Sequence, residues 1–95
     1  MKKNKKNLAL CEGRHEMPAV IEGAIFGNNL NPLDVEGLEK IASEKLADVQ
    51  HLTLYVTGLT VALVAVINVC HEKGIGLTLM HFDRVSGSYY QQIIK

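Results

Sequence analysis

The chain contains no tryptophan, and aromatic residues make up only 5% of its 95 positions. Stacking of nucleobases on aromatic side chains is therefore not expected to be its main mode of binding. Lysine and arginine together number 10, as do aspartate and glutamate, so no overall field draws the chain to nucleic acid. A phosphate-bearing ligand would have to be held by local groups.

The sequence also lacks the marks of secretion and of a metal site. Its two cysteines, Cys11 and Cys70, lie in apolar stretches, and we expect both to be buried free thiols. The apolar run after the first lysines, Leu8–Cys11, is too short for a signal peptide, so we expect a cytoplasmic protein. The histidines have no short spacing to one another or to the cysteines, so we expect no metal and no other cofactor.

What remains is the composition of one small folded domain. Hydrophobic residues at 47% and charged residues at 21% are typical of a globular chain. We expect residues 1–6 to form a basic flexible tail and residues 7–95 to form a single α/β domain. The uncharged run from Leu52 to Cys70 also has the length of a membrane span, which is the main alternative. Gly58 inside that run favours a turn between a strand and a helix.

The segment around this turn is the most informative part of the chain. Leu52–Thr57 is typical of a strand, Thr60–Lys73 of an apolar helix closed by a glycine, and Leu77–Phe82 of a second strand. This order implies a parallel pair with a right-handed crossover. We expect both strands to lie beside and parallel to Asn7–Cys11, in a small Rossmann-like α/β domain with a mostly parallel sheet.

An amphipathic helix is predicted upstream. Asn31 should cap it, with Pro32 at its first position. Four residues at helical spacing form its apolar stripe: Leu38, Ile41, Ala42 and Leu46. The preceding segment Ala19–Phe26 is ambiguous, because a helix begun after Pro18 would be interrupted by glycine.

The end of the chain is predicted to return along the sheet edge. After a turn, Tyr89–Ile94 should form an antiparallel hairpin with Leu77–Arg84. The apolar helix should be buried on more than one side, which so small a domain can hardly provide. We therefore expect its Val61–Val69 face to form a homodimer.

Two groups of candidate site residues follow the first strands, at the sheet edge where open α/β sheets bind ligands. In the turn Gly58, Leu59 and Thr60, close backbone approach and free N–H groups favour an anion. An ordinary strand-to-helix turn capped by Thr60 is the alternative. Arg14 and His15 follow the first strand and suit phosphate binding and acid–base chemistry respectively; an exposed loop is the alternative.

A third group lies where the last parallel strand ends. Alternation puts His81 and Asp83 on one face, where the carboxylate would orient the imidazole for acid–base catalysis. Arg84 and, on the returning strand, Tyr90 are further candidates for ligand binding. A strand end that becomes polar as it leaves the core explains the same residues without any chemistry.

The pair Arg14-His15 and the turn Thr57-Gly58-Leu59-Thr60, which leads into the apolar helix, also carry a resemblance. In these features the chain resembles small standalone Rossmann-like proteins of CRISPR defence, related to the CRISPR-associated Rossmann-fold (CARF) sensors. Such families bind cyclic oligoadenylates between two subunits, and some cleave them. A nucleotide site of this kind would use Arg14 to hold phosphate, the turn to cradle it, and His15 or His81 to transfer protons, although the segment around His81 is not part of the resemblance.

Two functions are compatible with these features, and fold alone does not separate them. One is a homodimer that binds a phosphate-bearing nucleotide, with slow metal-independent cleavage by the ligand's own 2′-hydroxyl if the protein is an enzyme. The other is a non-enzymatic interaction protein, an inhibitor or adaptor of a phage or mobile element, for which the same fold is a scaffold.

Overall fold

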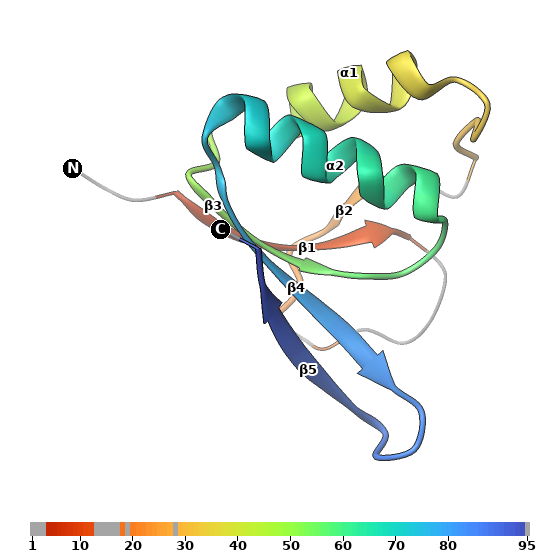
Figure 1. Ribbon diagram of the computed structural model, residues 1–95, viewed down its shortest axis with the longest axis vertical. Coiled ribbons are helices and arrows are strands. Elements are labelled where there is room, and N and C mark those ends of the chain that lie inside the picture. The colour runs from red at the N-terminus through yellow and green to blue at the C-terminus, as the bar shows by residue number, and fades with distance from the viewer. Residues whose placement is uncertain (1–3, 13–17, 19, 28, 95) are drawn as a thin grey trace.

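The computed structural model describes residues 4–12, 18, 20–27 and 29–94, and it forms a five-stranded sheet with both helices on one face (Figure 1). The elements in chain order are β1 (Lys5–Cys11), β2 (Ala24–Phe26), α1 (Val35–Lys45), β3 (His51–Tyr55), α2 (Thr60–Lys73), β4 (Gly76–Asp83) and β5 (Ser88–Ile93). The strand order is β2-β1-β3-β4-β5, and only β5 is antiparallel to its neighbour. The predicted fold class is confirmed.

The three predicted parallel strands, β1, β3 and β4, are adjacent. Leu8 pairs with Leu54, and Leu54 pairs with Leu79, so these side chains share one face of the sheet. The connections through α1 and α2 both advance toward β5, and right-handed crossovers then place both helices over that same face.

The helix α2 has its predicted bounds, and Gly74 closes it with φ 69°, in the left-handed region. Its neighbours cover more of it than the sequence indicates. The sheet lies beneath it, and on its α1 side Asn68 donates a hydrogen bond of 3.1 Å to Glu39. Of the large apolar side chains in this fully described helix, Val64 alone is exposed, at 47%. The Val61–Val69 face thus offers little uncovered apolar surface to a partner.

The cap of α1 differs from the prediction. Asp34, and not Asn31, caps the helix, and its Oδ1 accepts the N–H of Gly37 at 3.0 Å. Asn31 instead accepts the N–H of Leu33 at 3.0 Å, which forms a local turn before the helix. The prediction that Asn31 caps a helix with Pro32 in first position is therefore wrong.

The hydrophobic core lies between the helices and the sheet. Three residues of the predicted α1 stripe are buried in it: Leu38, Ala42 and Leu46. Ile41, the fourth, is 39% exposed. The described part of the ambiguous segment Ala19–Phe26 supplies β2, whose Ile25 enters the core. In the described ranges no helix is long and apolar enough to cross a membrane, and the uncharged run is divided between β3 and α2.

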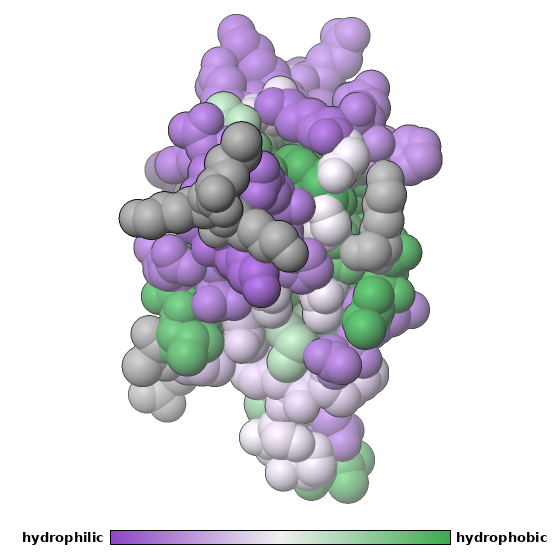
Figure 2. All heavy atoms as spheres, turned by 90° about the vertical axis from the view of Figure 1, so that its left-hand side faces the viewer, coloured by the Kyte–Doolittle hydropathy of each residue, from purple (hydrophilic) through white to green (hydrophobic). Residues whose placement is uncertain are grey.

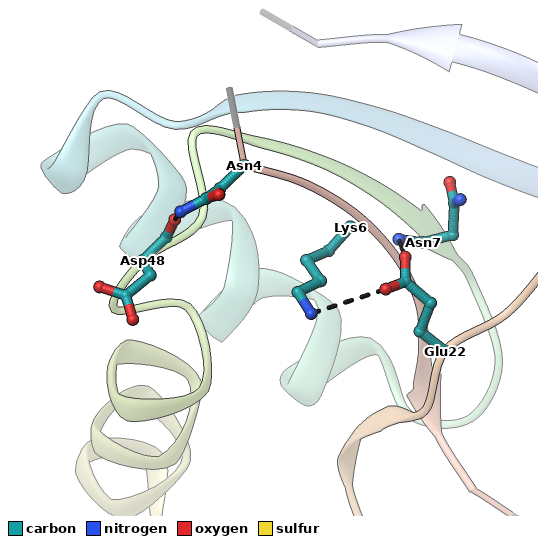
Figure 3. A network of polar contacts seen from close by, with 5 residues as sticks. All are labelled: Asn4, Lys6, Asn7, Glu22 and Asp48. Atoms are coloured by element: carbon teal, nitrogen blue, oxygen red, sulfur yellow. Dashed lines mark hydrogen bonds and ion pairs between the residues drawn. The ribbon is translucent and has the colours of Figure 1, made fainter. Parts of the chain in front are cut away.

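The strand β1 begins inside the stretch predicted as a tail. Figure 3 shows how its start is held: Lys6 Nζ lies 3.5 Å from Glu22 Oε1, while Glu22 Oε2 accepts the N–H of Asn7 at 2.9 Å. The side-chain amide of Asn4 donates to the carbonyl of Asp48 after α1. Residues 4–6 therefore belong to the folded domain, and the predicted boundary at residue 6 lies too far along the chain.

The strands β4 and β5 extend beyond the rest of the sheet. The last pair of β4 with β3 is Met80 with Tyr55, whereas its pairs with β5 continue to Asp83 with Ser88. Residues 81–90 thus form a two-stranded arm that projects from the body (Figure 1). In Figure 2 the arm extends below the body with a hydrophobic residue at its tip, where Val85 is 97% exposed.

Candidate functional site

The turn after β3 lies at the carboxyl end of the parallel strands, as predicted. Gly58 has φ 94°, a conformation that favours glycine, and Gly58, Leu59 and Thr60 are all exposed. Leu59 is the N-cap of α2 and makes no side-chain cap hydrogen bond. Thr60 is the first helical residue, so the alternative in which Thr60 caps the helix is wrong. The first N–H groups of α2 are therefore not occupied by a side-chain cap.

Thr57, beside this turn, serves the fold. Its side chain is 2% exposed, and its hydroxyl donates to the carbonyl of Cys11 at 2.9 Å and accepts the N–H of Cys11 at 3.2 Å. These bonds continue the pairing of β1 with β3 past its last ladder pair, Ala9 with Tyr55. The sequence resemblance includes Thr57, but its role here is to join two strand ends.

Arg14 and His15 lie outside the described residues. Because parallel strands put the loops that follow them at one edge of the sheet, we expect Arg14, the Gly58–Thr60 turn, His81 and Asp83 to line one cleft, and this stays a prediction. At the described end of β1, which lies between β2 and β3 in the sheet, Glu12 donates its N–H to the carbonyl of Phe26 of β2 at 3.0 Å.

His81 lies on the arm and contacts β5. Its Nε2 is 2.8 Å from Oε1 of Gln92, and its ring centroid is 5.3 Å from that of Tyr90, the residue opposite it. Two of the candidate site residues, His81 and Tyr90, are thus brought together. Strand alternation places Asp83 on the same face as His81, but the hydrogen bond of His81 goes to Gln92 and not to that carboxylate.

Asp83 holds the turn at the tip of the arm. Its carboxylate accepts the N–H groups of Val85 at 3.1 Å and Ser86 at 3.3 Å. Hydrogen bonds from the Ser86 side chain and from the Val85 N–H lower the pKa of Asp83 below its ordinary value of 3.8. The carboxylate is therefore a structural acceptor at neutral pH. Arg84, within this turn, is exposed.

The root of the arm is packed by aromatic rings on the face opposite the helices. The Tyr89 ring lies edge-on to Tyr55 at 5.1 Å and to Phe82 at 5.3 Å between centroids. Partial burial and the neighbouring Tyr55 raise the pKa of Tyr89. These contacts fix β5 against β3 and β4, so the outer edge of β5 is held in one position.

A cavity of about 310 Å³ lies between α2 and the end of β5, away from the predicted site residues. Most of its lining is aliphatic: Ile67, Ile75, Leu77 and Ile94. Asn68, Cys70 and His71 complete it. Burial raises the pKa of the Cys70 thiol from 9.0 to about 11, so this thiol is protonated at neutral pH and is a poor nucleophile. The cavity can therefore hold an apolar group but offers no evident catalyst.

The outer edge of β5 adjoins this cavity. In the described sheet β5 has a strand neighbour on one side only. Ile94 donates its N–H to the carbonyl of Leu77 at 2.9 Å. By the alternation of an antiparallel ladder, Tyr89, Gln91 and Ile93 then direct their N–H and C=O groups outward. The edge is a row of free backbone donors and acceptors.

The side chains along this edge carry no charge. Ser88–Ile94 contains no charged residue and no proline. Tyr90 is 57% exposed, Ile93 67% and Ile94 43%, and Ile94 also lines the cavity. The sequence predicted the hairpin but gave no sign that its outer edge would be both apolar and open.

Among residues 4–12, 18, 20–27 and 29–94, no three histidine, cysteine or acidic side chains are grouped to hold a metal ion. Comparison with known proteins finds no protein-family model, no curated protein and no solved structure that matches the chain. The resemblance to CARF-related proteins therefore rests on its short motifs.

Proposed function

We propose that the protein is a non-enzymatic interaction module that binds partners by strand addition at β5. The observation that carries the proposal is the open, uncharged edge of β5 beside an apolar cavity. An extended segment paired with Tyr89, Gln91 and Ile93 would satisfy their outward backbone groups. Every second side chain of that segment would face the helices, and one would lie over the cavity.

Nucleotide binding is the second candidate. It is supported by the exposed turn Gly58–Thr60 at the carboxyl edge and by the absence of a side-chain cap on the fully described helix α2. This candidate has less support, because the N-terminus of a helix does not by itself select a ligand. Arg14, the residue predicted to bind the phosphate, lies outside the described residues. The Nε2 of His81 is bonded to Gln92, so proton transfer by His81 would have to use its Nδ1.

A selection experiment separates these candidates. A library of random extended peptides is selected on the protein at a concentration where sedimentation shows monomers, and a nucleotide panel is screened by thermal shift. We expect enriched peptides with alternating apolar residues and no nucleotide that raises the melting temperature. Binding should be lost in Gln91→Pro, whose missing N–H would have pointed outward, and retained in Leu33→Lys, at a site 89% exposed.

Two outcomes would overturn strand addition. One is that enriched peptides bind Gln91→Pro as well as the wild-type chain. The other is that no peptide binds while a nucleotide stabilises the protein, which would favour the second candidate.

A further inference from the structure

We infer that the partner strand at the β5 edge is β5 of a second copy of this chain, antiparallel to the first about a two-fold axis at Gln91. This inference rests on the proposed function and names the partner. It joins two five-stranded sheets into one continuous sheet. The axis is perpendicular to that sheet, so the helices of both copies lie on the same side.

The composition of the β5 edge favours pairing with a copy of itself. Natural edge strands are protected from self-pairing by lysine, proline, bulges or inward charges. Ser88–Ile94 has neither charge nor proline, although the chain has 10 lysines and arginines in all. Like charges directly opposite one another destabilise strand pairs, so an uncharged strand pairs with a copy of itself without that penalty. The edge is therefore complementary to itself.

An antiparallel register centred on Gln91 pairs every residue of β5 whose backbone faces outward. Outward backbone groups belong to Tyr89, Gln91 and Ile93, so only these residues can exchange hydrogen bonds across the new interface. An axis at Gln91 places Gln91 opposite its own copy and Tyr89 opposite Ile93 of the second copy. Moving the axis by one residue leaves one of the three without a partner inside β5. The aromatic–β-branched pairs that result are favourable cross-strand pairs.

The cavity beside β5 would also be covered by a second copy. Ile94 lines it on the helix side of the sheet, together with Ile67 of α2. In the proposed register Ile94 lies opposite Ser88 of the second copy, and the two α2 helices flank the joined strands. The side of the cavity next to β5 then faces the second copy instead of solvent. One partner thus satisfies the free backbone edge and covers the exposed apolar side chains beside it.

Engineered cysteines test the register directly. Residues that form a hydrogen-bonded antiparallel pair have Cα atoms about 5.5 Å apart, within the range that a disulfide spans. Gln91→Cys should therefore give a covalent dimer on mild oxidation, whereas Leu33→Cys, at a site 89% exposed, should give little. The native thiols of Cys11 and Cys70 are buried and should not interfere. A covalent dimer formed equally by both variants would overturn the inference.

Sedimentation tests the edge without new thiols. The wild-type chain should dimerise at micromolar concentration. Gln91→Pro should weaken dimerisation by about tenfold to a hundredfold, because one outward backbone hydrogen bond is lost from each copy. Gln91→Ala keeps the backbone bonds and should dimerise like the wild type. Circular dichroism checks that each variant is folded.

The outcomes also separate this inference from the proposed function. A wild-type chain that stays monomeric, yet captures peptides that Gln91→Pro does not, refutes the second copy as partner and leaves strand addition standing. A dimer that Gln91→Pro leaves intact refutes the second copy at β5, because the contact then lies on another surface, and the peptide selection on Gln91→Pro decides strand addition separately.

Discussion

The hydroxyl of Thr57 bonds both backbone groups of one residue, the C=O and the N–H of Cys11. Thr57 thereby takes the place of a strand residue two positions beyond the last pair of the β1–β3 ladder, Ala9 with Tyr55. Both residues are almost completely buried, so water does not compete for these groups. The bonds fix where the turn to α2 begins relative to the end of β1.

We expect Thr57→Val, which keeps the shape of the side chain and removes the hydroxyl, to lower the free energy of unfolding by about 1–3 kcal/mol. The loss comes from two buried hydrogen bonds to Cys11. Thr57→Ser keeps the hydroxyl and should lose less. Urea denaturation measures both. A Thr57→Val protein as stable as the wild type would show that this contact does not support the turn.

The parallel core of the fold could be predicted because its signals extend over whole elements. Apolar composition identified β1, β3 and β4, and the glycine after Lys73 identified the end of α2. The cap of α1 was missed because Asn31 and Asp34 are both good capping residues three positions apart, and only the backbone decides between them. Single capping residues are weaker signals than a repeated pattern.

The candidate site was less predictable, because it depends on register and strand length. The partner of His81 is Gln92, and the β4–β5 pairing sets that contact. The projecting arm exists because β4 continues beyond the end of β3. No local sequence pattern encodes this difference in strand length. The open edge of β5 follows from its last place in the strand order, a property of the whole sheet.

The α2 surface tests where copies of the chain meet. The homodimer expected from the sequence used the Val61–Val69 face, and a charge there should either dissociate the dimer or unfold the protein. If β5 is the interface, Val64→Lys, at a site 47% exposed, should leave the sedimentation of the dimer unchanged, while Ile93→Lys should weaken it. The opposite pattern would return the interface to α2.

The Cys70 thiol should be unreactive in the native protein. Its pKa is about 11 because burial disfavours the thiolate, so at neutral pH a thiol reagent should label it only slowly and unfolding should accelerate labelling. The raised folded pKa also means that its stabilising contribution is present below pH 9.0 and is lost as the pH rises toward 11. Cys70→Ala should therefore lose less stability than the wild type over that interval. Rapid labelling of native Cys70 would contradict the assigned burial.

The turn at the tip of the arm should depend on the ionised form of Asp83. Hydrogen bonds from the Ser86 side chain and the Val85 N–H lower its pKa below 3.8, so the stabilisation is present above that pH and is lost as the pH falls through the lowered value. Asp83→Asn offers only a neutral acceptor at every pH, so it weakens these bonds wherever the wild-type carboxylate is ionised.

We expect Asp83→Asn to reduce amide protection at Val85 and Ser86 near neutral pH, with β3 unaffected, because the lost bonds lie only in the turn. Hydrogen exchange followed by NMR, corrected for intrinsic rates, measures this. In strong acid the wild type should approach the variant. Arg84→Ala, in the same turn, is the matched control and should leave both amides protected. Equal protection in Asp83→Asn and the wild type would mean that the backbone of the hairpin holds the turn without the carboxylate.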